Sequence, residues 1–492
     1  MLTFFFAALL AASPGYRAVQ VDAARVTGTI RSFQGVNDGP VPVVRRLPDL
    51  TTQYRDLHID IIRPHGMFGP VDIDSRWTHP NRIDQAAGAS AARTVFPNWS
   101  ADPQRPESYN FGPTDRVIQG IVGCGAEVYY PLARSFGADG TPPPDFDQYA
   151  EIVKHVAMHY NAGWANGYHD HIRYWEFWNE PDANPAWDPG FIQPFWSGTP
   201  AQFYQLYEKV ARALKSLDAS LKVGGPAIAA PDLSGPYREG FIAYCAAHRV
   251  PLDFFSWHHY FVSSYDPYDV VRIGRQIRGL LDAQGFRDAE TYITEWNMGP
   301  GHNTMRRPNQ PPAADAGFMG AVLTYLQESP VMRAMYYRAD VGNESLFERD
   351  GSYRKKAYVF KTAGEMLDTP DKLETSGADT AGFAVVAGRS TDRNRIRILI
   401  SNYEIPPEYR FPARSRARMP RQDGIAYHDN RGYALTVTNL PWGDASYKAT
   451  SYRVSAGDDF QPQSLPPGHG PTFELRRDLP PPAVELLVLE RQ

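Results

Sequence analysis

The sequence predicts an α/β fold, a (β/α)8 barrel of eight parallel strands, with an appended C-terminal all-β domain. Two observations predict the barrel. Strand-like and helix-like segments alternate over residues 32–371, and several of the strand segments are nearly continuous apolar runs, as expected for strands covered on both faces. Short alternating runs replace this pattern over residues 372–492 and predict the second domain. A chain of 492 residues is long enough for both.

The barrel segments can be placed in chain order. The expected strands are Ser32–Asn37, Ile59–His65, Ala126–Leu132, Ile172–Asn179, Lys222–Gly225, Asp253–Tyr260, Glu290–Asn297 and Met332–Arg338. Amphipathic segments with helical period lie between them. The clearest of these helices are Phe146–Tyr160, Ala201–Leu217, Val270–Ala283 and Ala314–Gln327.

The C-terminal region is expected to form a small β-sandwich. Clusters of Pro, Gly and Asp, such as Leu465-Pro-Pro-Gly, separate its runs and are typical of turns. The segment 18–31 precedes the barrel, alternates like a strand, and is expected to join this domain. The expected strands are Gly382–Ala387, Arg395–Asn402, Gly432–Val437, Tyr447–Val454 and Ala483–Leu489.

Composition narrows the class of partner. Hydrophobic residues make up 42% and charged residues 21% of the chain, which is ordinary for a soluble globular protein. The formal net charge is −5, so no basic excess points to nucleic acid or to an anionic membrane. Cys124 and Cys245 are expected to be two buried free thiols, although one bridge between them is the alternative.

The N-terminus, residues 1–18, resembles a signal peptide. Leu2–Ala12 is an apolar run that is too short to span a bilayer, and Ala11-Ala12-Ser13 has the small residues of a cleavage site. We therefore expect a periplasmic or secreted protein, and a cytoplasmic one if this run is not a signal peptide.

One glutamate ends the fourth expected strand. The strand Ile172–Asn179 contains Tyr174-Trp175-Glu176-Phe177-Trp178 and ends in Asn179-Glu180-Pro181. An acidic residue at the C-terminal end of a barrel strand projects into the mouth of the barrel, where partial desolvation raises the pKa of its carboxyl group. A general acid at neutral pH needs such a pKa. Capping of the next loop is the structural alternative, but the pattern favours Glu180 as a general acid/base.

A second glutamate, Glu295, ends the seventh expected strand within Tyr292–Asn297. Strands four and seven face each other across the mouth of an eight-stranded barrel, so the two carboxylates can approach closely. A separation of about 5–5.5 Å suits a nucleophile and an acid/base that retain the anomeric configuration through a covalent intermediate. Two such carboxylates also have split pKa values, so one remains ionised while the other holds a proton. Glu295 is the expected nucleophile.

Other strand-end residues are candidates for substrate binding. Asn179 could hydrogen-bond a sugar 2-hydroxyl, and Trp296 could either stack on the sugar or pack in the core beneath it. His258 and Tyr260 share one face of the sixth strand and could hydrogen-bond the nucleophile.

Arg63 and His65 end the second strand on a shared face. They are positioned for sugar hydroxyls or a carboxylate, and a structural ion pair is the alternative for Arg63.

The histidines do not form a metal motif, and neither a metal nor a cofactor is expected. His155 and His159 are four residues apart on a helix, but Val156 stands where a metalloprotease needs glutamate. His169 and His171 precede the fourth strand, at the end of the barrel opposite to catalytic sites. Both pairs are expected at the solvated surface.

At this point the chain resembles glycoside hydrolase family 39 of clan A. Asn179-Glu180-Pro181 and Thr294-Glu295-Trp296 look like the clan's acid/base and nucleophile motifs. Similarity to the family itself is carried by four further segments. They are Arg63-Pro-His65-Gly66, Asp253-Phe-Phe-Ser-Trp-His258-His-Tyr260, Phe195-Trp196-Ser197-Gly198 and Leu221-Lys-Val-Gly-Gly-Pro226.

The resemblance implies a barrel with a β-sandwich and an activity like that of β-xylosidases or α-L-iduronidases. It places Glu180 as acid/base and Glu295 as nucleophile. It also implies that His65, Asn179, His258 and Tyr260 contact substrate or support the nucleophile.

The third and eighth strands depart from the xylosidase pattern. The third reads Tyr129-Tyr130-Pro131-Leu132, and the eighth reads Tyr336-Tyr337-Arg338-Ala339-Asp340. These positions, Asp340 included, shape the substrate pocket, so the departures weaken the expectation of xylose. An inward Arg338 could hold a carboxylated sugar.

The expected function is therefore a retaining glycoside hydrolase, with an exo-acting β-xylosidase-like enzyme first. The substrate is an oligosaccharide or polysaccharide. Other exo-glycosidases acting on arabinosides, hexosides or uronides, and an endo-acting polysaccharide hydrolase, remain alternatives. A non-catalytic carbohydrate-binding barrel would require loss of one glutamate, and both are present.

Overall fold

The computed structural model describes residues 15–42, 47–65, 70–73, 94–133, 140–183, 194–233, 235–261, 266–298, 312–342, 345–404, 427 and 431–492. Most of the expected signal peptide lies outside these residues. So do large parts of the loops at 66–93 and 299–311, which follow the second and seventh barrel strands.

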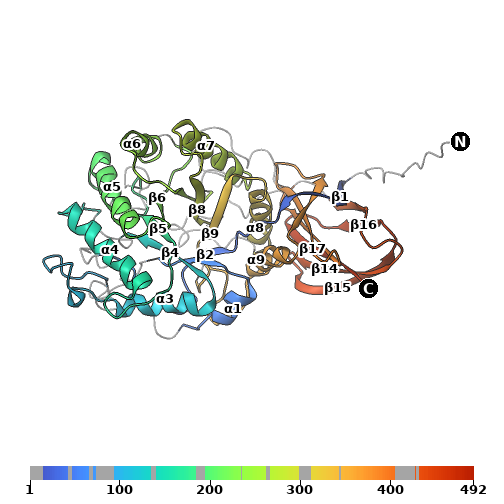
Figure 1. Cartoon of the computed structure of the whole chain (residues 1–492). Helices are drawn as coiled ribbons and strands as arrows, with labels where there is room; N and C mark the ends of the chain where they lie inside the picture. The colour runs from blue at the N-terminus through green and yellow to red at the C-terminus, as the bar shows by residue number, and fades with distance from the viewer. Residues whose placement is uncertain are drawn as a thin grey trace.

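Eight parallel strands close into a barrel, as the sequence predicts (Figure 1). Each pairs in parallel with the next along the chain, and β9 pairs with β2 to complete the ring. The strands are β2 (Gly35–Asn37), β3 (Ile61–Arg63), β4 (Glu127–Leu132), β5 (Tyr174–Phe177), β6 (Lys222–Ile228), β7 (Phe254–His259), β8 (Glu290–Trp296) and β9 (Val331–Tyr336).

Helices surround the barrel and cover the outer faces of its strands (Figure 1). The best-defined start is that of α5, where Thr199 and Gln202 form a reciprocal capping box and Pro200 is the first helical residue. The helices are α1 (Thr51–Asp56), α3 (Gly112–Cys124), α4 (Phe146–Ala162), α5 (Pro200–Leu217), α6 (Phe241–His248), α7 (Asp269–Ala283), α8 (Pro312–Leu326) and α9 (Lys355–Glu365). Short helical turns lie at Pro106–Ser108, Pro236–Gly240 and Met366–Asp368.

The inside of the barrel is filled by a layer of apolar side chains below the mouth. Because side chains alternate along a strand, every second residue faces inward and the others face the helices. This inner layer is separate from the large core between strands and helices. Its members are Ile61, Tyr129, Tyr174, Phe254, Tyr292 and Met335. These buried side chains lie directly below the polar residues at the mouth of the barrel.

The remaining strands form one nine-stranded sheet, so the expected β-domain is present but its strands are not divided into two separate sheets. The sheet order is β15-β14-β17-β12-β11-β10-β1-β13-β16. Strand β1 (Tyr16–Thr29) pairs antiparallel with β10 and parallel with β13, so the N-terminal strand belongs to this sheet. The other strands are β10 (Asp371–Ser376), β11 (Phe383–Arg389), β12 (Arg395–Asn402), β13 (Gly432–Thr438), β14 (Ser446–Val454), β15 (Asp459–His469), β16 (Phe473–Asp478) and β17 (Ala483–Arg491).

The segment Leu465-Pro-Pro-Gly is part of a strand, and its interpretation as a turn between strands was wrong. It lies within β15, whose residues are mostly exposed and which, among the strands that the structure describes, pairs only with β14. An edge strand tolerates proline because its outer N–H groups have no strand to pair with.

One face of the sheet packs against the barrel through α8 and α9 (Figure 1). Gly317 and Gly320 allow this close approach, because a Cβ atom at Gly320 would lie 2.7 Å from a methyl group of Val484. The hydroxyl of Ser401 donates to the carbonyl of Gly317 at 2.8 Å. The two domains therefore share a buried core.

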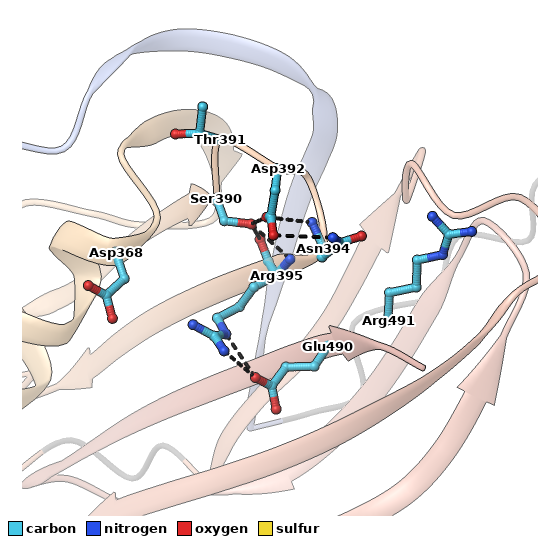
Figure 2. A pocket seen from close by; sticks show the side chains of 8 residues that line it. All are labelled: Asp368, Ser390, Thr391, Asp392, Asn394, Arg395, Glu490 and Arg491. Atoms are coloured by element: carbon cyan, nitrogen blue, oxygen red, sulfur yellow. Dashed lines mark hydrogen bonds and ion pairs between the residues drawn. The ribbon is translucent and has the colours of Figure 1, made fainter.

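A polar pocket lies on the β-domain, between the turn that joins β11 to β12 and the end of β17 (Figure 2). Arg395 pairs with Glu490 at 2.8 Å across it. Its lining residues are Asp368, Ser390, Thr391, Asp392, Asn394, Arg395, Glu490 and Arg491. The lining contains no aromatic ring and none of the predicted site residues.

The prediction of a solvated surface was wrong for two of the four histidines. His155 and His159 are buried, whereas His169 and His171 are exposed. The ring of His159 stacks on Phe111 with centroids 3.6 Å apart. Its Nε2 lies 3.0 Å from Oδ1 of Asp115 on α3. This face of α4 points toward α3, so its histidines are structural.

Two smaller findings complete the fold. Cys124 and Cys245 are both buried and free, as expected. No helix within the described ranges is both long enough and apolar enough to cross a membrane.

Candidate active site

The two predicted glutamates lie together at the mouth of the barrel. A carboxylate oxygen of Glu180 lies within 4.8 Å of one of Glu295, and both side chains are almost completely buried. Glu180 follows the end of β5 and Glu295 lies near the end of β8, and β6 and β7 separate these two strands in the barrel. The separation is that of two groups that can act on the same bond.

The position of Glu180 is set by the chain that follows β5. Trp178 and Glu180 have φ angles of 69° and 47°, in the left-handed region that side chains rarely adopt. The backbone N–H of Glu180 donates to the carbonyl of Ala227 at 2.9 Å. The carboxylate of Asp182 accepts from two backbone N–H groups of the loop after β6, each at 2.9 Å. These bonds join two neighbouring strand ends and hold the strained turn.

A β-bulge directs Glu295 into the mouth. Residue 293 pairs with Trp257, but the next pair joins His258 to Glu295, so Thr294 is an extra residue. Regular alternation from the inward-facing Tyr292 would point Glu295 toward the helices, and the bulge reverses this. The side-chain amide of Asn37 donates to the carbonyl of Thr294 at 2.9 Å and anchors the bulge.

The bulge also decides between the two interpretations of Trp296. Its side chain is completely buried and lies edge-on to Tyr336, with ring centroids 5.0 Å apart. The residue after Glu295 faces the surrounding helices, so Trp296 packs in the core. Its predicted role in stacking on substrate is therefore wrong.

His258 lies between the two carboxylates. Its Nδ1 is 2.8 Å from Oε1 of Glu180 and 3.6 Å from Oε2 of Glu295. Burial lowers the pKa of His258 to about 4, because an imidazolium ion is poorly solvated there. At neutral pH this histidine is uncharged, and its Nδ1 can either donate a hydrogen bond to Glu180 or accept one from it, depending on the tautomer.

Glu295 is surrounded by donors. The hydroxyl of Tyr260 donates to Oε2, Nη1 of Arg63 donates to Oε1 at 2.7 Å, and Nε2 of His65 lies 3.5 Å from Oε1. Burial alone would raise the pKa of Glu295. The neighbouring His258, His65 and Arg63 outweigh burial and hold that pKa well below its usual value. Glu295 is therefore ionised at neutral pH.

Arg63 joins several residues of the mouth and is itself almost completely buried. Besides Glu295, it donates through Nε to Glu176 at 2.6 Å and through Nη2 to Asn179 at 2.8 Å. Its Nη1 also donates to Oδ1 of Asn37 at 3.1 Å. The structural interpretation of Arg63 as an ion-pair partner is thus the one that the geometry favours.

The predicted binding residues lie around the carboxylate pair. Asn179 is half-buried and its side-chain oxygen accepts from Arg63, and its predicted contact with a sugar hydroxyl remains a prediction. His65 is placed by its backbone N–H, which donates to Asp38 at 2.9 Å, and its ring lies edge-on to Tyr337. The two rings form one wall beside Glu295.

Arg338 and Asp340 lie at the rim of the same wall and are paired with each other. Arg338 donates to Asp340 through Nε and Nη2, and its Nη1 lies 3.3 Å from a carboxylate oxygen of Asp38. Two carboxylates already neutralise the guanidinium, so the geometry disfavours the idea that Arg338 holds a carboxylated sugar. Asp340 accepts from Arg338, and its predicted contact with substrate remains a prediction.

The side chains of Glu180, His258 and Glu295 could also hold a divalent cation, since they offer two carboxylates and an imidazole. Their existing contacts with one another, with Arg63 and with Tyr260 place donors where a cation would have to bind. The set fits proton transfer between carboxylates better than metal binding.

Sequence reasoning missed three residues of this site. Asn37 anchors the bulge, Asp38 contacts His65 and Arg338, and Glu176 contacts Arg63. Asn37 is the last residue of β2 and Asp38 follows it, and a polar residue at a barrel strand end is a usable signal. Glu176 carries a weaker signal: an acid in the middle of an apolar strand must be buried beside a cation.

Comparison with known proteins places the chain in a family. The model for glycosyl hydrolases family 39 matches residues 125–353. The chain is 28% identical over 245 residues to a β-xylosidase from Geobacillus stearothermophilus, which covers 43% of this chain and 46% of that one. It is 25% identical over 296 residues to a β-xylosidase from Caldicellulosiruptor saccharolyticus, covering 54% and 55% of the two chains. The chain thus spans about half the length of the curated relatives it matches.

A solved structure extends the likeness to the whole chain. A glucosidase from Croceicoccus marinus is 32% identical, with a TM-score of 0.81 over 97% of this chain and 99% of that one. The chain belongs to glycoside hydrolase family 39. This confirms the family that the sequence motifs predict. The matched segment of this family 39 member runs from β4 past β9 and contains both glutamates.

Proposed function

We propose that this family 39 member is an exo-acting retaining glycoside hydrolase and that β-xylosides are its preferred class of substrate. Glu180 is the general acid/base and Glu295 the nucleophile. The observation that carries the proposal is the asymmetry of two close carboxylates. Arg63, Tyr260 and His65 all approach Glu295. Glu180 instead forms a hydrogen bond with Nδ1 of His258, which is neutral at pH 7.

The first step forms a covalent intermediate. An oxygen of Glu295 attacks the anomeric carbon while the bond to the leaving oxygen breaks, and that oxygen takes the proton of Glu180. The negative charge of Glu295 disappears as the glycosyl ester forms. Glu180 is left as a carboxylate 2.8 Å from Nδ1 of His258, which can then donate to it.

The second step releases the sugar. Glu180 takes a proton from a water molecule, the water oxygen attacks the anomeric carbon, and Glu295 leaves as a carboxylate. The donors around Glu295 stabilise the leaving carboxylate. Two inversions at the same carbon give net retention.

The experiment is a panel of chromogenic glycosides with the purified full chain. We expect β-xyloside turnover, with β-glucoside, α-arabinoside and iduronide compared in parallel. A β-glucosidase is the second candidate, favoured by the likeness over the whole chain to the Croceicoccus marinus glucosidase. Release of oligomers from polysaccharide, without turnover of any chromogenic glycoside, would overturn the exo-acting proposal in favour of an endo-acting enzyme. If the protein hydrolysed none of these substrates, the result would favour a non-catalytic barrel that binds carbohydrate.

We also propose that residues upstream of β1 direct export. The apolar run Leu2–Ala12 precedes a possible cleavage site, and β1 begins at Tyr16, so removal of the run leaves the β1 pairing intact. Expression of the full chain in a bacterium followed by fractionation tests this. Uncleaved protein found only in the cytoplasm would contradict it.

A further inference from the structure

A second buried glutamate shares the cation of the proposed nucleophile. Glu176 lies inside the barrel on β5, and none of its surface is exposed. Its Oε2 accepts from Nε of Arg63 at 2.6 Å, while Nη1 of the same guanidinium donates to Glu295 at 2.7 Å. The hydroxyl of Tyr129 donates to the other oxygen of Glu176 at 3.2 Å. One cation is therefore held between two anions.

The reaction changes the charge of only one of these anions. In the free enzyme, Arg63 faces two carboxylates. When Glu295 becomes a glycosyl ester it is neutral, and it no longer balances the guanidinium. If Glu295 were its only anion, a guanidinium that is 1% exposed would be left unpaired and strongly destabilised, because an unpaired buried charge is not solvated. Glu176 is the anion that remains.

We propose that Glu176 is a positioning residue that keeps Arg63 charge-paired while Glu295 is esterified, and so makes formation of the covalent intermediate easier. The inference rests on the proposed function, since it requires a glycosyl ester on Glu295. Glu176 touches no reacting atom in this account. It acts by holding the guanidinium plane through Nε, so that Nη1 stays directed at Glu295.

The surroundings of Glu176 offer no other cation among the described residues. The titratable or charged groups that interact with it are Arg63 on β3, Tyr129 on β4 and His258 on β7. Tyr292 on β8 packs against Tyr129, and Glu295 on β8 shares Arg63 with Glu176. The two tyrosines are kept neutral because burial raises their pKa values, and His258 is uncharged at neutral pH. The pairing of Glu176 with Arg63 thus has no substitute.

The experiment separates the two chemical steps. A 2-deoxy-2-fluoro glycoside with a dinitrophenolate leaving group, built on the sugar that the wild-type enzyme hydrolyses, traps the ester on Glu295. The rate of inactivation then reports formation of the ester, and the rate of reactivation reports its hydrolysis. In Glu176→Gln we expect inactivation to slow by at least about tenfold, because the ester leaves Arg63 unpaired. Reactivation should stay the same or become faster, because hydrolysis restores the pair.

Two further variants make the outcome decisive. Glu176→Asp keeps the charge but draws the carboxylate away from Nε of Arg63, so it should slow inactivation less than Glu176→Gln does. If Glu176→Gln does not fold, this smaller slowing of inactivation without slower reactivation is the test, and unchanged inactivation in Glu176→Asp would contradict the inference. Glu485→Gln is the matched control, since Glu485 is a completely buried acid paired with Arg477 in the β-domain. It should alter stability and leave both rates unchanged.

The outcomes distinguish the inference from the proposed function. If the wild-type enzyme is not inactivated, or if the label is not on Glu295, the proposed function fails. If the wild-type enzyme is labelled on Glu295 and Glu176→Gln shows an unchanged inactivation rate, or an equal slowing of both steps, the inference alone is wrong.

Discussion

The Nδ1 atom of His258 lies 2.8 Å from Oε1 of Glu180. This contact joins a buried imidazole to the proposed acid/base without adding a positive charge, because the pKa of His258 is lowered to about 4. A neutral imidazole can accept a hydrogen bond from protonated Glu180 or donate one to its carboxylate, and Glu295 remains the carboxylate that the cation Arg63 stabilises.

Stability should depend on pH through the buried histidines. Burial lowers the pKa of His258 and of His259 to about 4, from an ordinary value of 6.5. Between these values the unfolded chain binds more protons than the folded one, so the free energy of unfolding falls as pH falls from 6.5 to 4. The loss is up to about 3 kcal/mol per histidine. The pKa of Glu295 is lowered instead, so the contribution of this carboxylate to the free energy of unfolding is lost only below about pH 4.5.

Urea denaturation at pH 7 and at pH 4.5 measures this dependence. His259→Gln, which removes one of the two groups, should reduce the difference between the two pH values. The exposed His248 provides a matched variant, His248→Gln, that should retain the full difference. Equal pH dependence in all three proteins would contradict the assignment.

Replacing Glu180 should affect substrates according to their leaving groups. Glu180→Ala removes the proton donor, so aryl glycosides with good leaving groups should still form the covalent intermediate, while unactivated glycosides should lose about 10²–10⁴-fold in rate. Steady-state kcat/KM for a dinitrophenyl glycoside and for an oligosaccharide gives the comparison. A uniform loss for both substrates would argue against the acid role of Glu180.

Arg338 should matter for stability and not for recognition of uronides. Arg338→Ala leaves Asp38 and Asp340 close together without their cation, so the free energy of unfolding at pH 7 should fall by about 2–4 kcal/mol. The loss should shrink at low pH as Asp340 becomes protonated, because burial raises the pKa of this carboxyl group. Arg349→Ala, at an exposed position, should change stability by less than about 0.5 kcal/mol.

The same variant tests the uronide alternative. The ratio of kcat/KM for an iduronide to that for a neutral glycoside should not change in Arg338→Ala. A selective loss of the iduronide would show that Arg338 binds a sugar carboxylate.

Chelation should leave the activity unchanged. The three residues that could hold a cation, Glu180, His258 and Glu295, are already occupied by contacts with one another. Dialysis against EDTA followed by a standard assay is the measurement. Activity lost to EDTA and restored by Zn²⁺ or Mn²⁺ would contradict the proposed chemistry.

The barrel could be predicted from sequence because its strands are buried on both faces. Such strands are apolar runs, and each expected one coincides with a strand from β2 to β9. The three strands of the β-domain that were missed are different. β15 and β16 form the two edges of the sheet, where apolar runs are not required, and β15 contains prolines. β10 lies inside the sheet, but it is polar and pairs with β11 only through Asp371 and Lys372.

Within the site, strand ends were predictable and internal geometry was not. Glu180, Glu295, His258 and Tyr260 follow apolar runs and lie where barrel strands end. The bulge at Thr294 has no signature in the sequence, so whether Trp296 faces the sugar or the core could not be decided. The same limit hid Asn37 and Glu176, whose importance lies in partners from distant strands.

The anomeric configuration of the first product tests the central claim most directly. Proton NMR during hydrolysis of a β-aryl glycoside resolves the two anomers of the released sugar before they interconvert. Two close carboxylates acting as nucleophile and acid/base predict that the β-anomer appears first. First appearance of the α-anomer would mean a single displacement by water, and would contradict the role assigned to Glu295.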